Sequence, residues 1–356
     1  MRYLELDVHS EATVLCLVDA QGNEVEHGKV DTTGPALQKL VKRLSATEEL
    51  TVGQEVGTMC HFVHDAISAT GVKILSFNAQ QIRLICSSRK KTDKRDAYWI
   101  AKLLASQMMP HPVYVPGAQI RALRGLLSLR RSLVQERKRW LLRARSHLRA
   151  AGLKLPSKSR TVARLRASVL SGSDGVDEHL GVALDVCQRQ EEQLSPELKS
   201  IEARLLRETK DVAEVQRLKT IPAVADWVAI GIYAWVGEVS RFPNARVLCA
   251  YVGLVPSVHQ SGKTQQQGAI TKTGSSALRS VLVQAGHVLL FRCNDEYAAP
   301  LQTIAKRVHT NRARRKIAVV AAARHILRLA FYVLRDGKDY NPALLRSNAQ
   351  VSNPAA

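Results

Sequence analysis

The amino-acid sequence predicts an α/β domain at the N-terminus, a basic helical connector and a mainly α C-terminal domain. Three observations support this division of the 356 residues. Strand and helix signals alternate over residues 1–110, a strongly basic helical pattern covers 111–218, and a third region with its own apolar segments covers 219–340. A chain of this length can form two or three domains with separate cores. The polar residues 341–356 predict a disordered tail.

The N-terminal domain begins with three predicted strands. They cover 3–8, 13–18 and a more polar segment through Val25 and Val30. A helix follows Gly34-Pro35, and then come a short strand ending at Glu55, a helix around 62–67 and a strand over 72–77. Three strands in a meander followed by alternating helices and strands is the order of an RNase H-like fold. In that fold Asp7, on the first strand, lies beside Glu55.

Two further acids open an apolar helical pattern that would pack beside that strand pair. Asp93 and Asp96 are three residues apart, so they share one helix face. Two carboxylates on one face repel each other unless a cation lies between them, and oxygen-only ligands suit Mg²⁺. The alternative is helix capping, because acids are favoured in a first helical turn and Thr92 is a suitable N-cap.

The composition predicts a partner that is a polyanion. The formal net charge is +21, which favours nucleic acid over a membrane surface. We expect no membrane partner, because no run is long and apolar enough to span a bilayer and the N-terminus lacks a signal-peptide layout. Aromatic residues are few, so base stacking is not expected to dominate recognition. The scattered cysteines lack CxxC pairs and predict reduced, mostly buried thiols of a cytoplasmic protein: Cys16, Cys60, Cys86, Cys187, Cys249 and Cys293.

Residues 117–152 form a helical pattern that is basic around most of its circumference. Apolar side chains recur every seven residues at Leu127, Val134, Leu141 and Leu148, as they do in coiled coils. The alternative to a binding role for the charge is a face that is merely solvated. Arginines this dense are better explained by phosphate contacts, and the candidates are Arg130, Arg131, Arg137, Arg143, Arg145 and Arg149.

A second heptad-like run extends from Leu184 to Val215, after a linker over 152–180 that contains Gly, Ser and Pro. Glu191 and Glu208 interrupt its apolar seam, and Ser195-Pro196 predicts a fresh helix start or a kink. Two such runs joined by a linker predict an antiparallel hairpin or a coiled coil between chains.

A Ser-Gly turn at 261–264 is a second candidate site. It is not a nucleotide-binding P-loop, because Ser257 stands where that motif needs a glycine five residues before Gly262. The family resemblance described below implies a catalytic serine in this turn, at Ser261; a small flexible turn would let its hydroxyl approach a phosphodiester, and Lys263 could offset charge that develops on phosphorus. His259 could orient or deprotonate that serine, although a lone histidine in a turn is more often structural. Ser257 is an alternative serine.

Two sets of motifs connect these sites to a known family. The N-terminal set is Leu6-Asp7-Val8-His9, Glu55-Val-Gly-Thr58, Asn78 through Ile82-Arg83, and Lys91-Thr-Asp93-Lys-Arg-Asp96-Ala97. The C-terminal set is Ile221-Pro222, Gly237 to Pro243, Ala250 to Pro256, Ser261-Gly-Lys263, Ile270-Thr-Lys272, Gly274 and Leu278-Arg279. With both sets, the chain resembles the DEDD insertion-sequence transposases, the IS one-ten family related to the Piv DNA invertases. The chain departs from the family's Ile-Pro-Gly-Ile-Gly at Ala223 and Ala225, where two glycines would let backbone amides approach a phosphate.

The resemblance implies a RuvC-like N-terminal domain and a C-terminal transposase domain whose catalytic serine is Ser261. The order and context of the four acids favour the metal-site interpretation over helix capping, with Mg²⁺ held by Asp7, Glu55, Asp93 and Asp96. Lys263, Lys272 and Arg279 join the nucleic-acid-binding candidates.

The resemblance further implies a DNA transposase or recombinase of the bacterial cytoplasm and nucleoid. It would act on donor and target DNA, guided by a non-coding bridge RNA. Because the acids and the serine lie in different domains, we expect composite active sites in a homo-oligomer, either a dimer or a tetramer. Two rivals are a RuvC-like structure-selective DNA endonuclease and a non-catalytic nucleic-acid-binding protein.

Overall fold

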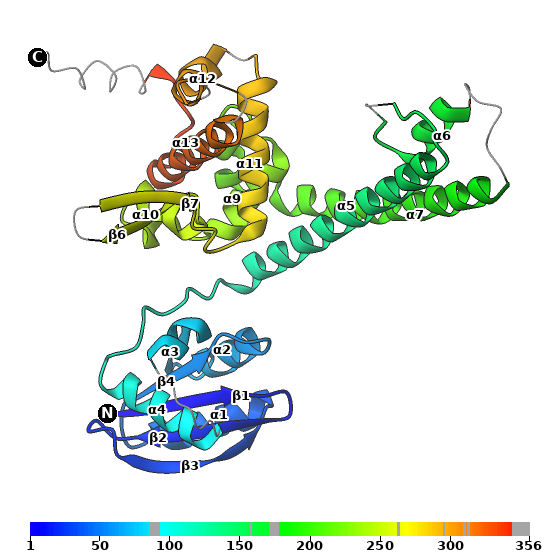
Figure 1. Ribbon diagram of the computed structural model, residues 1–356. Helices are drawn as coiled ribbons and strands as arrows, with labels where there is room; N and C mark the ends of the chain where they lie inside the picture. The colour runs from blue at the N-terminus through cyan, green and yellow to red at the C-terminus, as the bar shows by residue number, and fades with distance from the viewer. Residues whose placement is uncertain are drawn as a thin grey trace, which may run out of the picture. The chain divides into compact units, whose positions relative to one another are not determined.

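The computed structural model describes residues 1–85, 93–156, 159–170, 178–261, 264–294, 296–308, 311 and 314–343. The chain divides into two compact units, Met1–Pro116 and Gly117–Ala356 (Figure 1). The first unit is a mixed α/β structure, and the second is mainly helical.

The first unit is built on a five-stranded sheet of order β3-β2-β1-β4-β5. Its strands are β1 (Arg2–Val8), β2 (Ala12–Val18), β3 (Glu24–Asp31), β4 (Leu50–Glu55) and β5 (Lys73–Phe77). The first three pair antiparallel as a meander, whereas β1, β4 and β5 pair in parallel. The strands predicted over this region, including the one that ends at Glu55, are therefore confirmed.

Alternating side chains give the sheet two apolar faces, each covered by helices. Leu4 and Leu6 of β1 belong to a core cluster with α1 (Gly34–Ser45) and α2 (Cys60–Ser68). Tyr3 of β1 points to the opposite face, where Ala97 and Leu104 of α4 (Asp93–Ala105) are buried. The short helix α3 (Ala79–Ile85) adds Ile82 to this second cluster. Burial on both faces explains why β2 is a nearly continuous apolar run.

The second unit begins with two long helices that lie side by side and run in opposite directions, α5 (Ala118–Ala150) and α7 (Glu178–Thr209) (Figure 1). The segment between them contains a further helix, α6 (Val162–Leu170), which packs on both long helices through Val162 and Leu165. Of the two alternatives predicted at Ser195-Pro196, the helix start is wrong, because α7 continues through Pro196, and the kink stays a prediction. Proline has no N–H to donate, so α7 lacks one backbone hydrogen bond there.

The rest of this unit is a helical core with one β-hairpin. Its elements are α8 (Ala213–Leu218), α9 (Asp226–Val236), η1 (Val239–Arg241), α10 (Ala245–Val252), β6 (Pro256–Ser261), β7 (Thr264–Ile270), α11 (Ser276–Phe291), η2 (Glu296–Ala298), α12 (Ala299–Lys306) and α13 (Arg315–Asp336). Helices α11 and α13 pack closely at Gly286, where a Cβ would be 2.5 Å from the carbonyl oxygen of Val319. A glycine is therefore needed at this crossing.

Helix α13 corrects one expectation about membranes. It is long and apolar enough to cross a bilayer, although none of the sequence was expected to be. Half of its most apolar window is buried inside the unit, and Ala322, Ala323 and Ile326 belong to the helical core. Such burial is typical of the core helix of a globular protein.

The cysteines behave as predicted wherever they are described. Cys60, Cys187 and Cys249 are free and buried, Cys16 is buried, and Cys293 is free and half-buried. Cys86 lies outside the described residues, as does most of the predicted disordered tail, from 344 onward.

Candidate active site

The carboxyl ends of β1 and β4 bring two of the predicted acids together. Leu6 pairs with Gln54 in the parallel register, so the next residues along, Asp7 and Glu55, are neighbours at the same edge of the sheet. The side chain of Asp7 is 34% exposed, and its Oδ2 lies 3.3 Å from Nε2 of His9. A protonated His9 would therefore form an ion pair with Asp7.

Helix α4 places the other two acids in the same unit. It begins at Asp93 and packs against β1 and β2, on the face to which Tyr3 also points. The buried residues that hold it there are Ala97, Ile100, Ala101 and Leu104. The backbone at Asp93 and Asp96 is helical, but their side chains lie outside the described part of the chain.

A second carboxylate of β1, which no sequence motif marks, belongs to this face. Glu5 is 0% exposed, and burial, followed by the charges of Glu55 and Asp7, raises its pKa well above the usual value. The signal was present in the sequence, since Glu5 stands between Leu4 and Leu6 in a strand buried on both faces. A carboxyl group in such a position needs a partner or a specific role.

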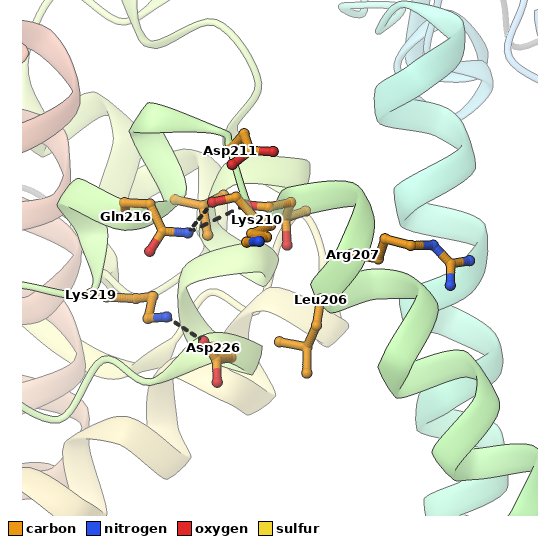
Figure 2. A pocket seen from close by; sticks show the side chains of 9 residues that line it. Leu206, Arg207, Lys210, Asp211, Gln216, Lys219 and Asp226 are labelled. Atoms are coloured by element: carbon orange, nitrogen blue, oxygen red, sulfur yellow. Dashed lines mark hydrogen bonds and ion pairs between the residues drawn. The ribbon is translucent and has the colours of Figure 1, made fainter.

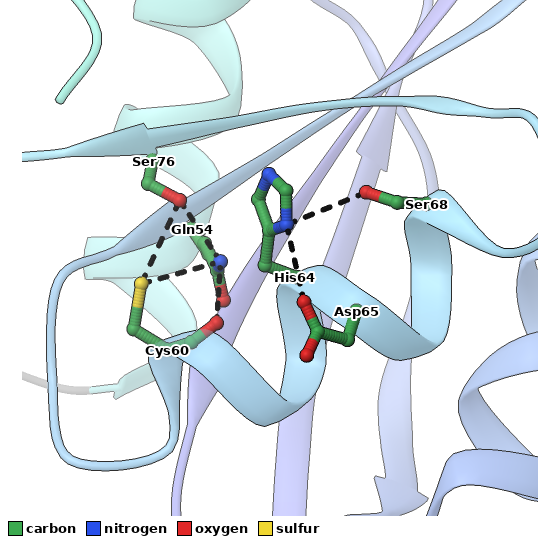
Figure 3. A network of polar contacts seen from close by, with 6 residues as sticks. All are labelled: Gln54, Cys60, His64, Asp65, Ser68 and Ser76. Atoms are coloured by element: carbon green, nitrogen blue, oxygen red, sulfur yellow. Dashed lines mark hydrogen bonds and ion pairs between the residues drawn. The ribbon is translucent and has the colours of Figure 1, made fainter. Parts of the chain in front are cut away.

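A polar network fixes the end of β4 beside the acids (Figure 3). The buried Gln54 donates from Nε2 to Oγ of Ser76 at 3.0 Å and to the carbonyl of Cys60 at 3.1 Å. Cys60 opens α2 and also donates from Sγ to Ser76. Strand β5 and the start of α2 are thus tied to the residue that precedes Glu55, which restricts the position of that carboxylate.

The donor chemistry of this edge suits a hard cation. Asp7 and Glu55 offer only oxygen, the ligand that Mg²⁺ prefers. Within the described residues, no group of three His, Cys, Asp or Glu side chains is arranged as a ready metal cage. Any cation bound here would therefore draw on Asp93, Asp96 or a rearranged carboxylate as well.

Ser261 occupies the end of a strand at a hairpin turn. It is the last residue of β6 and pairs with Thr264 of β7, whereas Gly262 and Lys263 between them lie outside the described residues. The side chains of Ser261 and His259 are not described either. The alternative serine, Ser257, faces β7 closely, because a Cβ built on Gly268 would be 2.5 Å from its Oγ.

The loop that carries Lys272 is held against α10 by tight backbone contacts. Cβ atoms on Gly253 or Gly274 would lie within 2.3 Å of backbone oxygens, and both residues have a positive φ. Nη1 of Arg279 donates to the carbonyls of Val252, Thr273 and Gly274 at 2.6–3.1 Å. Arg279 therefore stabilises the loop, while Lys272 is exposed on it.

The arginines of α5 divide into two groups. Arg130 joins helices: it pairs with Glu202 of α7 at 2.7 Å and stacks 4.1 Å from the ring centre of Trp227 of α9. Arg145 donates to the carbonyl of Ser159, and Arg131 donates to the hydroxyl of Ser276. Arg143 and Arg149 are exposed and Arg137 is half-buried; Arg143 also stacks within its own helix, 4.2 Å from the ring centre of Trp140. This second group keeps its guanidinium groups available for an external anion.

A pocket of about 710 Å³ lies where α7, α8 and α9 meet (Figure 2). Arg207, Lys210 and Lys219 line it, and Lys219 pairs with Asp226 at 2.7 Å. The sequence analysis did not identify this pocket, because its residues come from separate helices and form no motif.

The turn that enters α9 shows how this chain tolerates its departure from the family pattern. Ala223 has φ +64°, in the left-handed region that favours glycine. Ala225, in contrast, is extended, with φ −91° and ψ −179°. Only the first of the two alanines therefore adopts a backbone conformation that a glycine would adopt at lower energy.

Comparisons with known proteins identify both units. A DEDD transposase model of the IS110 type matches residues 5–152, and a model described as "Transposase IS116/IS110/IS902 family" matches 215–302. The chain belongs to the IS110 family of transposases.

Curated relatives of this transposase agree with the two models. The chain is 24% identical to the transposase for insertion sequence element IS1111A of Coxiella burnetii, over 88% of this chain and 85% of the relative. It is 25% identical to the transposase for element IS1328 of Yersinia enterocolitica, over 85% and 90% of the two chains. A pilin gene-inverting protein of Moraxella bovis is 29% identical over 35% of this chain and 38% of its own. Transposition and DNA inversion both recombine DNA, so a DNA recombination activity is supported.

Proposed function

We propose that this transposase cleaves and rejoins DNA with Ser261 as nucleophile, assisted by Mg²⁺ held by Asp7, Glu55, Asp93 and Asp96. The observation that carries the proposal is the position of Asp7 beside Glu55 at the carboxyl ends of two parallel strands. The helix that begins at Asp93 packs on the same sheet. Family membership supports the combination of these acids with a serine in the second unit.

The proposed architecture has an RNase H-like, RuvC-like domain over 1–110. A meander followed by two parallel strands, in the order β3-β2-β1-β4-β5, supports this assignment. We interpret 111–218 as a coiled-coil connector, supported by the antiparallel pair α5 and α7, and 219–340 as the serine-bearing domain. Residues 341–356 form the proposed disordered tail.

The proposed chemistry conserves the energy of the broken phosphodiester bond. Oγ of Ser261 attacks phosphorus, and the bond from phosphorus to the leaving sugar oxygen breaks. The serine proton is lost to solvent or a nearby base, and the leaving oxygen gains a proton as a free hydroxyl. The covalent phosphoserine is then attacked by the hydroxyl of another strand, which releases Ser261 without ATP.

The residues of this chain hold and shield the reacting groups. A bound Mg²⁺ would stabilise charge on the leaving oxygen and the phosphoryl group. The four acids would hold the cation, and Lys263 would offset negative charge near Ser261. Because the acids and the serine belong to different compact units, we propose a composite site that assembles in a homo-oligomer, a dimer or a tetramer.

The proposed nucleic-acid partners are donor DNA, target DNA and a guiding bridge RNA, and basic side chains would bind their phosphates. Arg137, Arg143 and Arg149 are the principal phosphate contacts that we propose on α5, with Arg131 and Arg145 beside them. Lys263 and Lys272 would contact DNA near Ser261. Arg130 and Arg279 would contribute by holding helices and a loop in place, since both are engaged with protein groups. The protein would act on nucleoid DNA in the bacterial cytoplasm.

The nucleophile and the acids can be tested with one DNA substrate. Purified protein, co-expressed with the DNA that flanks its gene, is incubated with labelled donor DNA and Mg²⁺ and run on a denaturing gel. The parent should form a covalent protein–DNA adduct. Ser261→Ala should bind DNA without forming the adduct, and Asp7→Asn should abolish cleavage while the chain remains folded.

The same gel separates the rival functions. A RuvC-like endonuclease would still cleave DNA with water in Ser261→Ala, and a binding protein would cleave nothing in any variant. Ser257→Ala is the matched control, and loss of the adduct in that variant alone would move the nucleophile to Ser257. Sequencing of co-purified RNA tests whether a bridge RNA is bound. Recombination by RNA-free protein would exclude a guiding role for RNA.

A further inference from the structure

The carboxylate of Glu5 is enclosed without a counter-charge. Its residue is 0% exposed, and neither Oε1 nor Oε2 has a hydrogen-bond partner in the part of the chain that the structure describes. Buried side-chain oxygens are nearly always hydrogen-bonded, because water that solvated them must be replaced. A buried carboxylate that has no hydrogen-bond partner and lies next to other acids would therefore be stabilised by a bound cation or by a hydrogen-bond donor.

The neighbouring strand makes room for this carboxylate. Glu5 pairs with Gly53 of β4, and a Cβ on Gly53 would lie 2.8 Å from Oε2 of Glu5 and 3.0 Å from Cδ2 of Leu104. Any larger residue at 53 would displace either the carboxylate or α4. The space above Gly53 is thus shared by the Glu5 carboxylate and the side chains of Leu104 and Phe77.

This space lies on the same sheet face as the proposed metal ligands. Residues two apart on a strand share a face, so Glu5 and Asp7 of β1 face the same way, as do Gly53 and Glu55 of β4. Their Cα atoms are about 6.7 Å apart along the strand. The described carboxylates do not already form a cage of three, so a shared cation requires the flexible Glu5 side chain to turn along β1 toward Asp7, to Mg–O distances of about 2.1 Å.

We propose that Glu5 is an additional carboxylate ligand of the divalent-cation site. It would bind the cation from the interior of the domain, while Asp7 and Glu55 bind it from the carboxyl ends of β1 and β4. This inference rests on the metal-dependent function proposed above. It explains why a buried strand of this chain carries an acid opposite a glycine. It also supplies a described oxygen ligand beyond the pair Asp7 and Glu55.

Metal binding by the full-length chain tests the proposal without an activity assay. Metal-free protein is titrated with Mg²⁺ by calorimetry, and its Tm is measured with and without Mg²⁺. Glu5→Gln retains the size of the side chain but cannot become anionic, and it should weaken Mg²⁺ binding at least about tenfold. Its metal-free Tm should match or exceed that of the parent, because a buried acid has been removed. Glu24→Gln, at an exposed position on β3, is the control and should bind Mg²⁺ like the parent.

The outcomes distinguish Glu5 from the wider metal site. If Asp7→Asn abolishes Mg²⁺ binding while Glu5→Gln binds with parental affinity, Glu5 is not a ligand and the proposed function stands. If Asp7→Asn leaves the affinity unchanged, the acid site itself is wrong and Glu5 falls with it. Should the buried amide of Glu5→Gln lower the Tm, Glu5→Leu provides an apolar replacement, and parental Mg²⁺ affinity in a folded Glu5→Leu would equally overturn the proposal.

Discussion

The backbone N–H of Val162, the first residue of α6, donates a hydrogen bond to Oε2 of Glu191 on α7 at 2.6 Å. Glu191 is buried and stands in the apolar seam of its helix. A carboxylate at a helix N-terminus is stabilised by unpaired N–H groups and by the helix dipole. The acid that interrupts the heptad pattern therefore helps to attach α6 to the hairpin, together with apolar packing and the ion pair of Arg166 with Asp185 of α7.

Glu191→Ala should destabilise the second unit. The substitution leaves the N–H of Val162 without its acceptor and opens a cavity, so we expect a loss of about 2 kcal/mol in the free energy of unfolding. Urea denaturation monitored by circular dichroism measures it. Glu197→Ala, on the exposed side of the same helix, should change the free energy by less than about 0.5 kcal/mol. Equal effects of the two substitutions would contradict the capping role.

Ala223→Gly should stabilise the chain. At φ +64° an alanine pays a left-handed penalty of about 1–2 kcal/mol, while glycine costs about 0.5–1 kcal/mol of extra unfolded-state entropy. The net gain should be roughly 0.5–1 kcal/mol in the free energy of unfolding, again from urea denaturation. Ala225→Gly, at an extended position, should lose a similar amount. A loss in both variants would show that the backbone at 223 is not strained.

Acid should destabilise the protein through His325 of α13. Burial, followed by the charges of Arg328 and Arg324, lowers its pKa from 6.5 to about 4. The folded state therefore favours the neutral ring: the stability is complete above pH 6.5 and is lost as the pH falls toward 4. Allowing for partial exposure, the loss is roughly 1–2 kcal/mol.

His325→Gln should remove this part of the pH dependence. The Tm of parent and variant is measured between pH 7 and pH 4. The fall in Tm over this range should be smaller in the variant than in the parent. His179→Gln, at an exposed site on α7, should follow the parental profile. A parental slope in His325→Gln would assign the acid sensitivity to other groups.

Charge removal on α5 should weaken nucleic-acid binding and reduce its salt dependence. In a triple variant with glutamine at Arg137, Arg143 and Arg149, each lost phosphate contact should lower the slope of log K against log salt by roughly 0.7–0.9. Binding to RNA and DNA by filter retention at several salt concentrations measures the slope. The fold should survive, because Leu123, Ala144 and Leu148 provide the buried side of α5.

The matched control for that variant is Arg204→Gln. Arg204 is exposed on α7 but already pairs with Glu208 at 2.7 Å, so its removal should leave the slope nearly unchanged. An unchanged slope in the triple variant would indicate that these α5 arginines form a solvated charged face and do not contact phosphates.

The sequence alone was sufficient to predict the strands and most helices of the first unit, and the position of Asp7 next to Glu55. The polar–apolar alternation along β1, the apolar run of β2 and the helical period of α4 are local patterns, and local patterns reflect which face is buried. Once the strand order was predicted, the position of Asp7 beside Glu55 followed from the topology, since parallel strands end at one edge. Sequence motifs also identified the family.

Only the tertiary structure decided which partners the polar side chains have. Arg130 and Arg143 are indistinguishable as arginines of one basic helix, yet Arg130 joins three helices while Arg143 is exposed. Glu5 and Glu191 interrupt apolar patterns, but their roles depend on Gly53 and Val162, residues of other elements. The physical reason is that burial can be inferred from a segment's own periodicity, whereas a hydrogen bond or an ion pair depends on the group that folding brings to it from elsewhere in the chain.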